Sequence, residues 1–105
     1  MKFTMGDYSN GSSLQGFVNI EYATLTKIFG QPTDDGDGYK IDAMWRMKFA
    51  DGTTASIYNY KDGKNYTNGK GMPISLITNW HIGGENKNAV DRVMEVIDEH
   101  TTEAA

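Results

Sequence analysis

The 105-residue chain contains no cysteine. Disulfide bonds, thiolate metal sites and a cysteine nucleophile are therefore excluded. Long apolar runs are also missing: no stretch reaches the roughly 18 residues of a membrane span, and the N-terminus has no signal-peptide core. We therefore expect one small domain in a reducing cytosol, with no membrane partner.

Basic residues are fewer than acidic ones, 10 against 14, which gives a net charge of −4. A nucleic-acid-binding surface displaces counterions with lysine and arginine, so this balance disfavours nucleic acid as a partner. Histidine is equally scarce, with only His81 and His100, and no motif of a hydrolase, zinc protease or phosphate-binding loop occurs. We expect a protein that is not an enzyme and needs no cofactor.

Acidic residues gather in the stretch TDDGDG at residues 33–38. Calcium loops of the EF-hand type need a glutamate at their twelfth position, and none follows in that register. We interpret the stretch as a solvated turn, and no metal site is predicted.

Hydrophobic periodicity predicts two helices. The first spans about residues 20–29, with Asn19 as its cap and Gly30 just beyond its end. The second follows Gly83 and Gly84, with Asn86 or Asn88 as its cap. Its inward side chains recur with helical spacing and are Val90, Val93, Met94 and Ile97.

Strands are predicted at residues 14–20, 41–49, 53–60 and 77–82. The second alternates apolar and polar residues and enters a hairpin at residues 50–52. A two-residue turn would place Trp45 opposite Tyr58, whereas a three-residue loop with Gly52 left-handed places Trp45 opposite Ile57. The second register is preferred, because it makes both inner faces apolar.

The predicted fold is α+β, in the order β-α-β-β-β-α. An antiparallel sheet of three to four strands, with both helices on one face, satisfies all the apolar stripes. Residues 14–99 form this domain, residues 1–13 a flexible arm, and residues 100–105 a frayed tail.

The uncovered face of this sheet is the first candidate binding surface. We expect it to display Arg46, Lys48, Tyr58 and Tyr60, with Tyr66 from the loop at residues 61–72. Tyrosine and arginine are enriched at protein interfaces, so a partner protein could bind there. An ordinary solvated face is the alternative, and a symmetric homodimer through this face is a further hypothesis.

The stretch TNWHIGGENKNAV, residues 78–90, is the second candidate. Glycines before a helix can let backbone N–H groups approach an anion, so a nucleotide or phosphate site could involve His81, Gly83, Gly84 and Lys87. The alternative is a tight turn into the helix with Trp80 in the core. Strand alternation favours the turn, because Trp80 and Ile82 share one face and His81 takes the other.

Four strings carry a resemblance to a known group: SLQGFV, FGQPTDDGDGYK, WRMKFADGTTASIYNYKDGKNY and WHIGG. Together they resemble a group of short accessory proteins of tailed bacteriophages, over about residues 12–97. The resemblance implies a phage protein that acts in the cytoplasm of a bacterial host, where it binds and inhibits or sequesters a host component, such as an anti-defence inhibitor. A nucleotide-binding sponge and a virion or assembly accessory protein are the alternatives.

Overall fold

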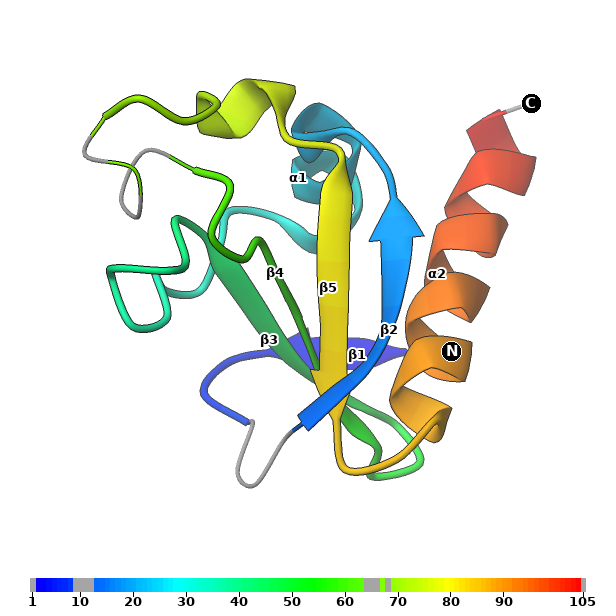
Figure 1. The fold of residues 1–105 in the computed structure, drawn as a ribbon. Helices are drawn as coiled ribbons and strands as arrows, with labels where there is room; N and C mark the ends of the chain where they lie inside the picture. Colours follow the sequence, from blue (N-terminus) through cyan, green and yellow to red (C-terminus); the bar gives the residue numbers. More distant parts are fainter. Residues whose placement is uncertain (1, 9–12, 64–66, 68, 105) are drawn as a thin grey trace.

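A computed structural model describes residues 2–8, 13–63, 67 and 69–104. Figure 1 shows how the described strands and helices are arranged. They are β1 (Phe3–Met5), β2 (Ser13–Asn19), α1 (Tyr22–Phe29), β3 (Met44–Phe49), β4 (Thr54–Tyr58), the short 3-10 helix η1 (Ile74–Leu76), β5 (Asn79–Gly84) and α2 (Asn88–Ala104).

The strands form one antiparallel sheet in the order β1-β3-β4-β5-β2. The predicted α+β class with two helices is confirmed, but the predicted three to four strands and the predicted order were wrong. Five described strands are present because β1, within the expected flexible arm, pairs with β3 through Phe3 opposite Phe49 and Met5 opposite Met47. Three residues are too few to show a strand period, so the sequence pattern did not reveal β1.

The predicted hairpin register is confirmed. Trp45 lies opposite Ile57 and Met47 opposite Ala55. Gly52 has a φ of 92°, a conformation that glycine adopts without steric cost, so it can close the three-residue loop. The apolar inner face of the β3–β4 pair therefore follows from the loop type.

The first helix ends at Phe29 as predicted, but it begins later than expected. α1 begins at Tyr22, because Asn19 is still in β2 and Glu21 occupies the cap position without a side-chain cap bond. For α2, the Asn86 Oδ1 accepts the N–H of Asn88, the first residue of the helix, at 2.9 Å. α2 continues to Ala104, so it includes most of the segment that was expected to fray.

Gly83 and Gly84 lie in β5, so the prediction that they form the turn into the last helix was wrong. Their missing side chains serve packing instead. A Cβ on Gly84 would overlap the Ala89 Cβ of α2, and one on Gly83 would stand 2.7 Å from the Ser56 Oγ. Each glycine therefore lets a neighbouring element approach the strand closely.

Two buried tryptophans connect the sheet to α1. Trp45 on β3 and Trp80 on β5 have no exposed surface, and their rings meet edge to face at 5.2 Å. The Trp45 Nε1–H donates to the Gly30 carbonyl at 2.9 Å, and the Trp80 Nε1–H donates to the Ile20 carbonyl at 3.0 Å. These two carbonyls flank α1, so the tryptophans hold both ends of that helix against the sheet.

The second helix covers the rest of the same face. Its Ala89 and Val93 are fully buried, and Val96 and Ile97 are nearly so. Ala89 reaches Gly84, whose missing side chain would point to this inner face. With α1 and α2 both on the inner face, neither helix covers the opposite face of the sheet (Figure 1).

We expect Trp80→Phe to lower the free energy of unfolding by about 2–3 kcal/mol, because it removes the N–H donor of the Ile20 carbonyl and leaves part of the ring volume empty. Urea denaturation would measure the change. Leu76→Ala is the control, since Leu76 is 63% exposed and its removal should cost no more than about 0.5 kcal/mol. Equal effects of the two substitutions would contradict the role of Trp80.

Candidate functional site

Four aromatic side chains meet on the face of the sheet that the helices leave uncovered. The strand register places His81 of β5 between Phe17 of β2 and Tyr58 of β4. Tyr60, two residues beyond Tyr58, joins them through a ring contact with His81. We call Phe17, Tyr58, Tyr60 and His81 the aromatic patch.

The imidazole of His81 is the centre of the patch. Its ring centroid lies 4.8 Å from that of Phe17, with the planes almost perpendicular at 86°. The distances to Tyr58 and Tyr60 are 5.4 Å and 5.6 Å, with interplanar angles of 67° and 31°. Edge-to-face and tilted contacts of this kind are attractive, so the four rings hold one another in place.

Much of the patch is open to solvent. Phe17 is 58% exposed and Tyr60 is 39% exposed, while Tyr58 and His81 are partly buried beneath them. Leu14, opposite Gly83 at the start of β2, is 49% exposed. Large apolar side chains grouped on one face in this way are typical of interaction sites.

A turn in the chain positions Tyr60 over His81. The next residue, Lys61, has a φ of 65°, which is uncommon for a residue with a side chain. Its N–H donates to the Lys40 carbonyl at 2.7 Å, and its Nζ lies 5.2 Å from the centre of the Tyr60 ring. Tyr60 therefore contacts both the imidazole of His81 and the cation of Lys61.

A fully buried amide, Asn59, fixes the backbone just before Tyr60. Its Oδ1 accepts the N–H groups of Asp42 and Ala43, at 2.7 Å and 3.1 Å. Its Nδ2 donates to the carboxylates of Asp42 and Asp62, both at 3.1 Å. All the hydrogen-bonding groups of this side chain are thus used to hold the loops on which Tyr60 depends.

Burial also sets the charge of the patch. It lowers the pKa of His81 below the ordinary value of 6.5, although the Asp62 carboxylate opposes this change. Burial, together with the neighbouring Tyr60, raises the pKa of the Tyr58 hydroxyl. At neutral pH the patch is therefore an uncharged aromatic surface.

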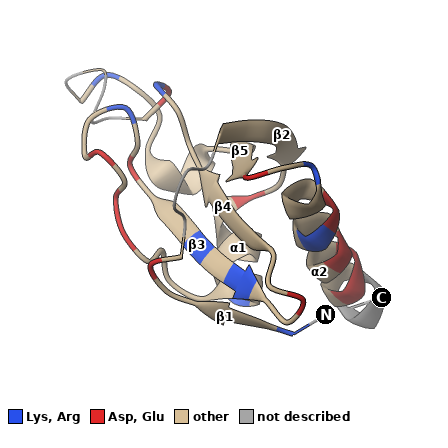
Figure 2. Ribbon diagram, turned by 90° about the horizontal axis from the view of Figure 1, so that it is seen from below, with Lys and Arg blue, Asp and Glu red and all other residues tan. Residues whose placement is uncertain are grey.

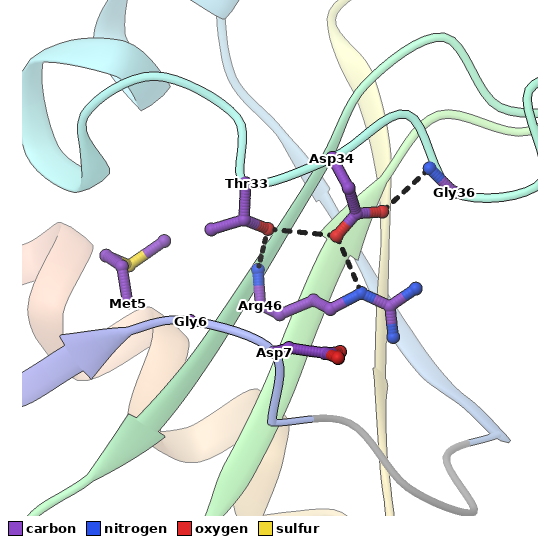
Figure 3. Close-up of a pocket in the computed structure, with 7 residues that line it drawn as sticks. All are labelled: Met5, Gly6, Asp7, Thr33, Asp34, Gly36 and Arg46. Atoms are coloured by element: carbon purple, nitrogen blue, oxygen red, sulfur yellow. Dashed lines mark hydrogen bonds and ion pairs between the residues drawn. The ribbon is translucent and has the colours of Figure 1, made fainter.

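Arg46 lies on the same face but takes part in a different site. This site is an open pocket of about 590 Å³, whose lining residues are drawn in Figure 3: Met5, Gly6, Asp7, Thr33, Asp34, Gly36 and Arg46. The Arg46 Nε donates to the Asp34 Oδ2 at 2.8 Å, the Thr33 hydroxyl donates to the same oxygen at 3.2 Å, and the Gly36 N–H donates to Oδ1 at 2.7 Å. Burial raises the pKa of Asp34, but these bonds outweigh it and leave that pKa below the ordinary value.

The carboxylates of the TDDGDG stretch serve the backbone of their own loop. The Asp37 Oδ1 accepts the N–H groups of Tyr39, Lys40 and Ile41, which lowers the pKa of Asp37. Asp34 similarly accepts the Gly36 N–H and the Arg46 Nε–H. Among the residues that the structure describes, no group of three His, Asp or Glu side chains could hold a metal ion.

The predicted partner-binding residues fall into separate groups. Tyr58 and Tyr60 belong to the aromatic patch, whereas Arg46 is engaged by Asp34 and Lys48 lies between Thr4 of β1 and Thr54 of β4. Tyr66 lies outside the described residues. Met44, the first residue of β3, is only 7% exposed, and its backbone pairs with that of Asp34.

The predicted ligand-binding residues are also divided. His81 is at the centre of the aromatic patch, Gly83 and Gly84 are buried within β5, and Lys87 lies in the turn before α2. Two neighbours of His81 and Tyr60 were not foreseen from the sequence, namely Phe17 and Lys61. A bulge between Leu14 and Gly16 breaks the alternation of β2, so no simple period could assign Phe17 to a face.

No protein-family model matches the chain, and neither a curated protein nor a solved structure is significantly similar to it. Within the described ranges, neither helix is long and apolar enough to cross a membrane. Function is therefore inferred from the geometry of the uncovered sheet face.

The lowered pKa of His81 gives stability a defined pH dependence. The unfolded chain takes up a proton near the ordinary pKa of 6.5, and the folded chain does so only at lower pH. The contribution of neutral His81 to the free energy of unfolding is thus fully present above about pH 6.5. It is lost as the pH falls from there to the pKa of His81 in the folded chain. We expect urea denaturation to show a decrease in the free energy of unfolding from pH 7 to pH 5.

His81→Gln is the control for this decrease, because it removes the titrating group. Asp34, Asp37 and Asp51 have lowered pKa values, so their contributions are lost only near and below their ordinary value of 3.8, outside this pH window. A decrease of the same size in His81→Gln would show that the buried imidazole is not its cause.

Proposed function

We propose that this chain is a non-enzymatic binding protein that holds a partner protein against the aromatic patch. The observation that carries the proposal is the exposure of Phe17 and Tyr60, at 58% and 39%, on a sheet face that neither helix covers. A patch at the core of an interface is typically aromatic and poor in charge, as this one is.

The side chains of the aromatic patch are already held in place before a partner protein binds, which favours tight binding. Phe17, Tyr58 and Tyr60 each rest on His81, so their rings are ordered before a partner arrives. Ordering side chains on association costs free energy, and side chains that are already held avoid part of this cost. Tyrosine is also over-represented among the residues that dominate binding energy.

A nucleotide ligand is less well supported. A base would need an open ring face on which to stack, but the Tyr60 ring already contacts that of His81 and has the Lys61 Nζ 5.2 Å from its centre. The predicted anion-binding turn is also absent from the described residues 83–84, which are extended strand. We therefore favour a protein over a nucleotide as the occupant of the patch.

The nature of the partner follows from the sequence resemblance to tailed-phage accessory proteins. On that basis we propose a component of the bacterial host, which the chain inhibits or sequesters in the host cytoplasm, for example a factor of antiviral defence. Binding to virion proteins is the alternative. Capture from uninfected cells distinguishes the two, because only host components are present there.

We expect Phe17→Ala and Tyr60→Ala each to weaken the partner complex by at least about tenfold, since each removes an exposed ring from the aromatic patch. The wild-type chain would first be used to capture its partner from lysates of uninfected and infected cells, with identification by mass spectrometry. The dissociation constant of the purified partner would then be measured for each variant.

Leu76→Ala is the matched control, because Leu76 is 63% exposed but belongs to η1 and not to the patch. It should bind within about twofold of wild type. Circular dichroism would show that the variants are folded. Unchanged affinity of both patch variants, or no retained protein from either lysate, would contradict the proposed function.

A further inference from the structure

The two edge strands of the described sheet, β1 and β2, differ in how well they discourage pairing with an additional strand. β1 is only three residues long and follows Lys2, both features that discourage further strands. β2 is seven residues long, SLQGFVN, and contains no charged residue. Its only irregularity is the bulge between Leu14 and Gly16, which leaves the part that bears Phe17 regular.

Backbone hydrogen-bonding groups of β2 point away from the sheet at Phe17 and Asn19. The Ile20 N–H donates to the carbonyl of the directly opposed Thr78 at 2.8 Å. In an antiparallel pair, bonded and non-bonded pairs alternate, so Val18 is bonded to β5 while Phe17 and Asn19 are not. Because β2 ends the described sheet, the N–H and C=O groups of Phe17 and Asn19 are available to one more strand.

The inner side of this edge is bordered by α2. A Cβ on Gly16 would meet the Val90 Cγ2, so the Val90 side of the helix faces β2. Helical periodicity places Met94 beside Val90 and then Asp91 and Asp98 further out on the same flank, both of them exposed. The helix is rich in acids, and Arg92 is its one arginine. Figure 2 shows the red acidic segments along its described part.

An added strand would therefore have two different sides. Side chains on one side would lie next to Phe17 and Leu14, on the aromatic face. Side chains on the other would lie next to Met94 and the carboxylates of Asp91 and Asp98. This asymmetry selects apolar or aromatic residues at alternate positions and basic residues between them.

We propose that the partner inserts an extended segment, in which aromatic or aliphatic residues alternate with Lys or Arg, as a sixth strand on the free edge of β2. The proposal rests on the proposed function and names the form in which the partner meets the aromatic patch. Main-chain hydrogen bonds at Phe17 and Asn19 supply affinity, and the alternating side chains supply specificity.

A second copy of this chain is a poorer occupant of the same edge. Twofold pairing of β2 with β2 would place both α2 helices side by side on one face of the joined sheet. The carboxylates of Asp91 and Asp98 would then approach those of the other copy, and β2 has no basic residue to offset them. A basic partner segment avoids this repulsion.

The test uses the full-length ¹⁵N-labelled chain and a synthetic peptide, acetyl-Thr-Lys-Phe-Lys-Val-Lys-Phe-Thr-amide. In the free chain, we expect the amides of Phe17 and Asn19 to exchange with solvent faster than that of Val18. Adding the peptide should slow exchange at Phe17 and Asn19 by at least about tenfold. A peptide with Glu in place of Lys should bind at least about tenfold more weakly, with the difference shrinking at high salt.

Asn19→Pro tests the backbone requirement directly. Asn19 contributes no N–H to the β2–β5 pairing, so proline there removes only the outward donor. We expect it to abolish peptide binding and keep the dispersion of the other amide signals. Should Asn19→Pro unfold the chain, Phe17→Lys is the second variant, because a lysine at the edge repels the basic peptide and removes the ring.

Equal binding of the Lys and Glu peptides, binding that leaves β2 amides unprotected, or no binding of either peptide would each overturn strand addition at β2. These results can be separated from failure of the proposed function. If the peptides fail while capture of the partner still depends on Tyr60, the β2 pairing is wrong and the aromatic patch remains the binding surface.

Discussion

The contact between Trp45 and Trp80 is the interaction on which the rest of the structure depends. These rings meet in the core on two different strands, and their indole N–H groups hold the carbonyls on both sides of α1. Strand alternation then determines on which face of the sheet the neighbouring side chains lie. Since Trp80 points inward, His81 must point outward, and the same register places Phe17 and Tyr58 beside it. The buried pair thus determines which residues form the uncovered face.

The side chains on the uncovered face are held in place and yet exposed to solvent. The imidazole of His81 supports three other rings, and the buried Asn59 holds the loops that carry Tyr60 over it. Burial keeps the patch uncharged, while Arg46 is engaged by Asp34 in a neighbouring pocket. Phe17 also connects the patch to β2, the last strand of the described sheet. A surface that offers both fixed aromatic rings and the outward backbone groups of an edge strand is suited to an extended protein segment.

Sequence patterns predicted the parts of this arrangement that local physics controls. The register of the β3–β4 hairpin and the opposite orientations of Trp80 and His81 followed from alternation and loop type. β1 was not predicted, because its pairing with β3 depends on residues more than forty positions away and three residues show no period. Phe17 was missed because the bulge in β2 hides which face of the strand it lies on. The glycines of β5 were misread because a glycine pair before a helix is equally consistent with a turn and with close packing, which here involves Ser56 and Ala89.

Dye-sensitised photo-CIDNP NMR, which polarises only Tyr, Trp and His rings that a dye can reach, tests the central claim most directly. In the free chain, Tyr60 and the 55% exposed Tyr39 should be polarised, and both tryptophans should be silent. Adding the purified partner should remove the Tyr60 signal and leave that of Tyr39, which lies outside the aromatic patch. A Tyr60 signal that persists at full strength in the complex would contradict the assignment of this face as the binding surface.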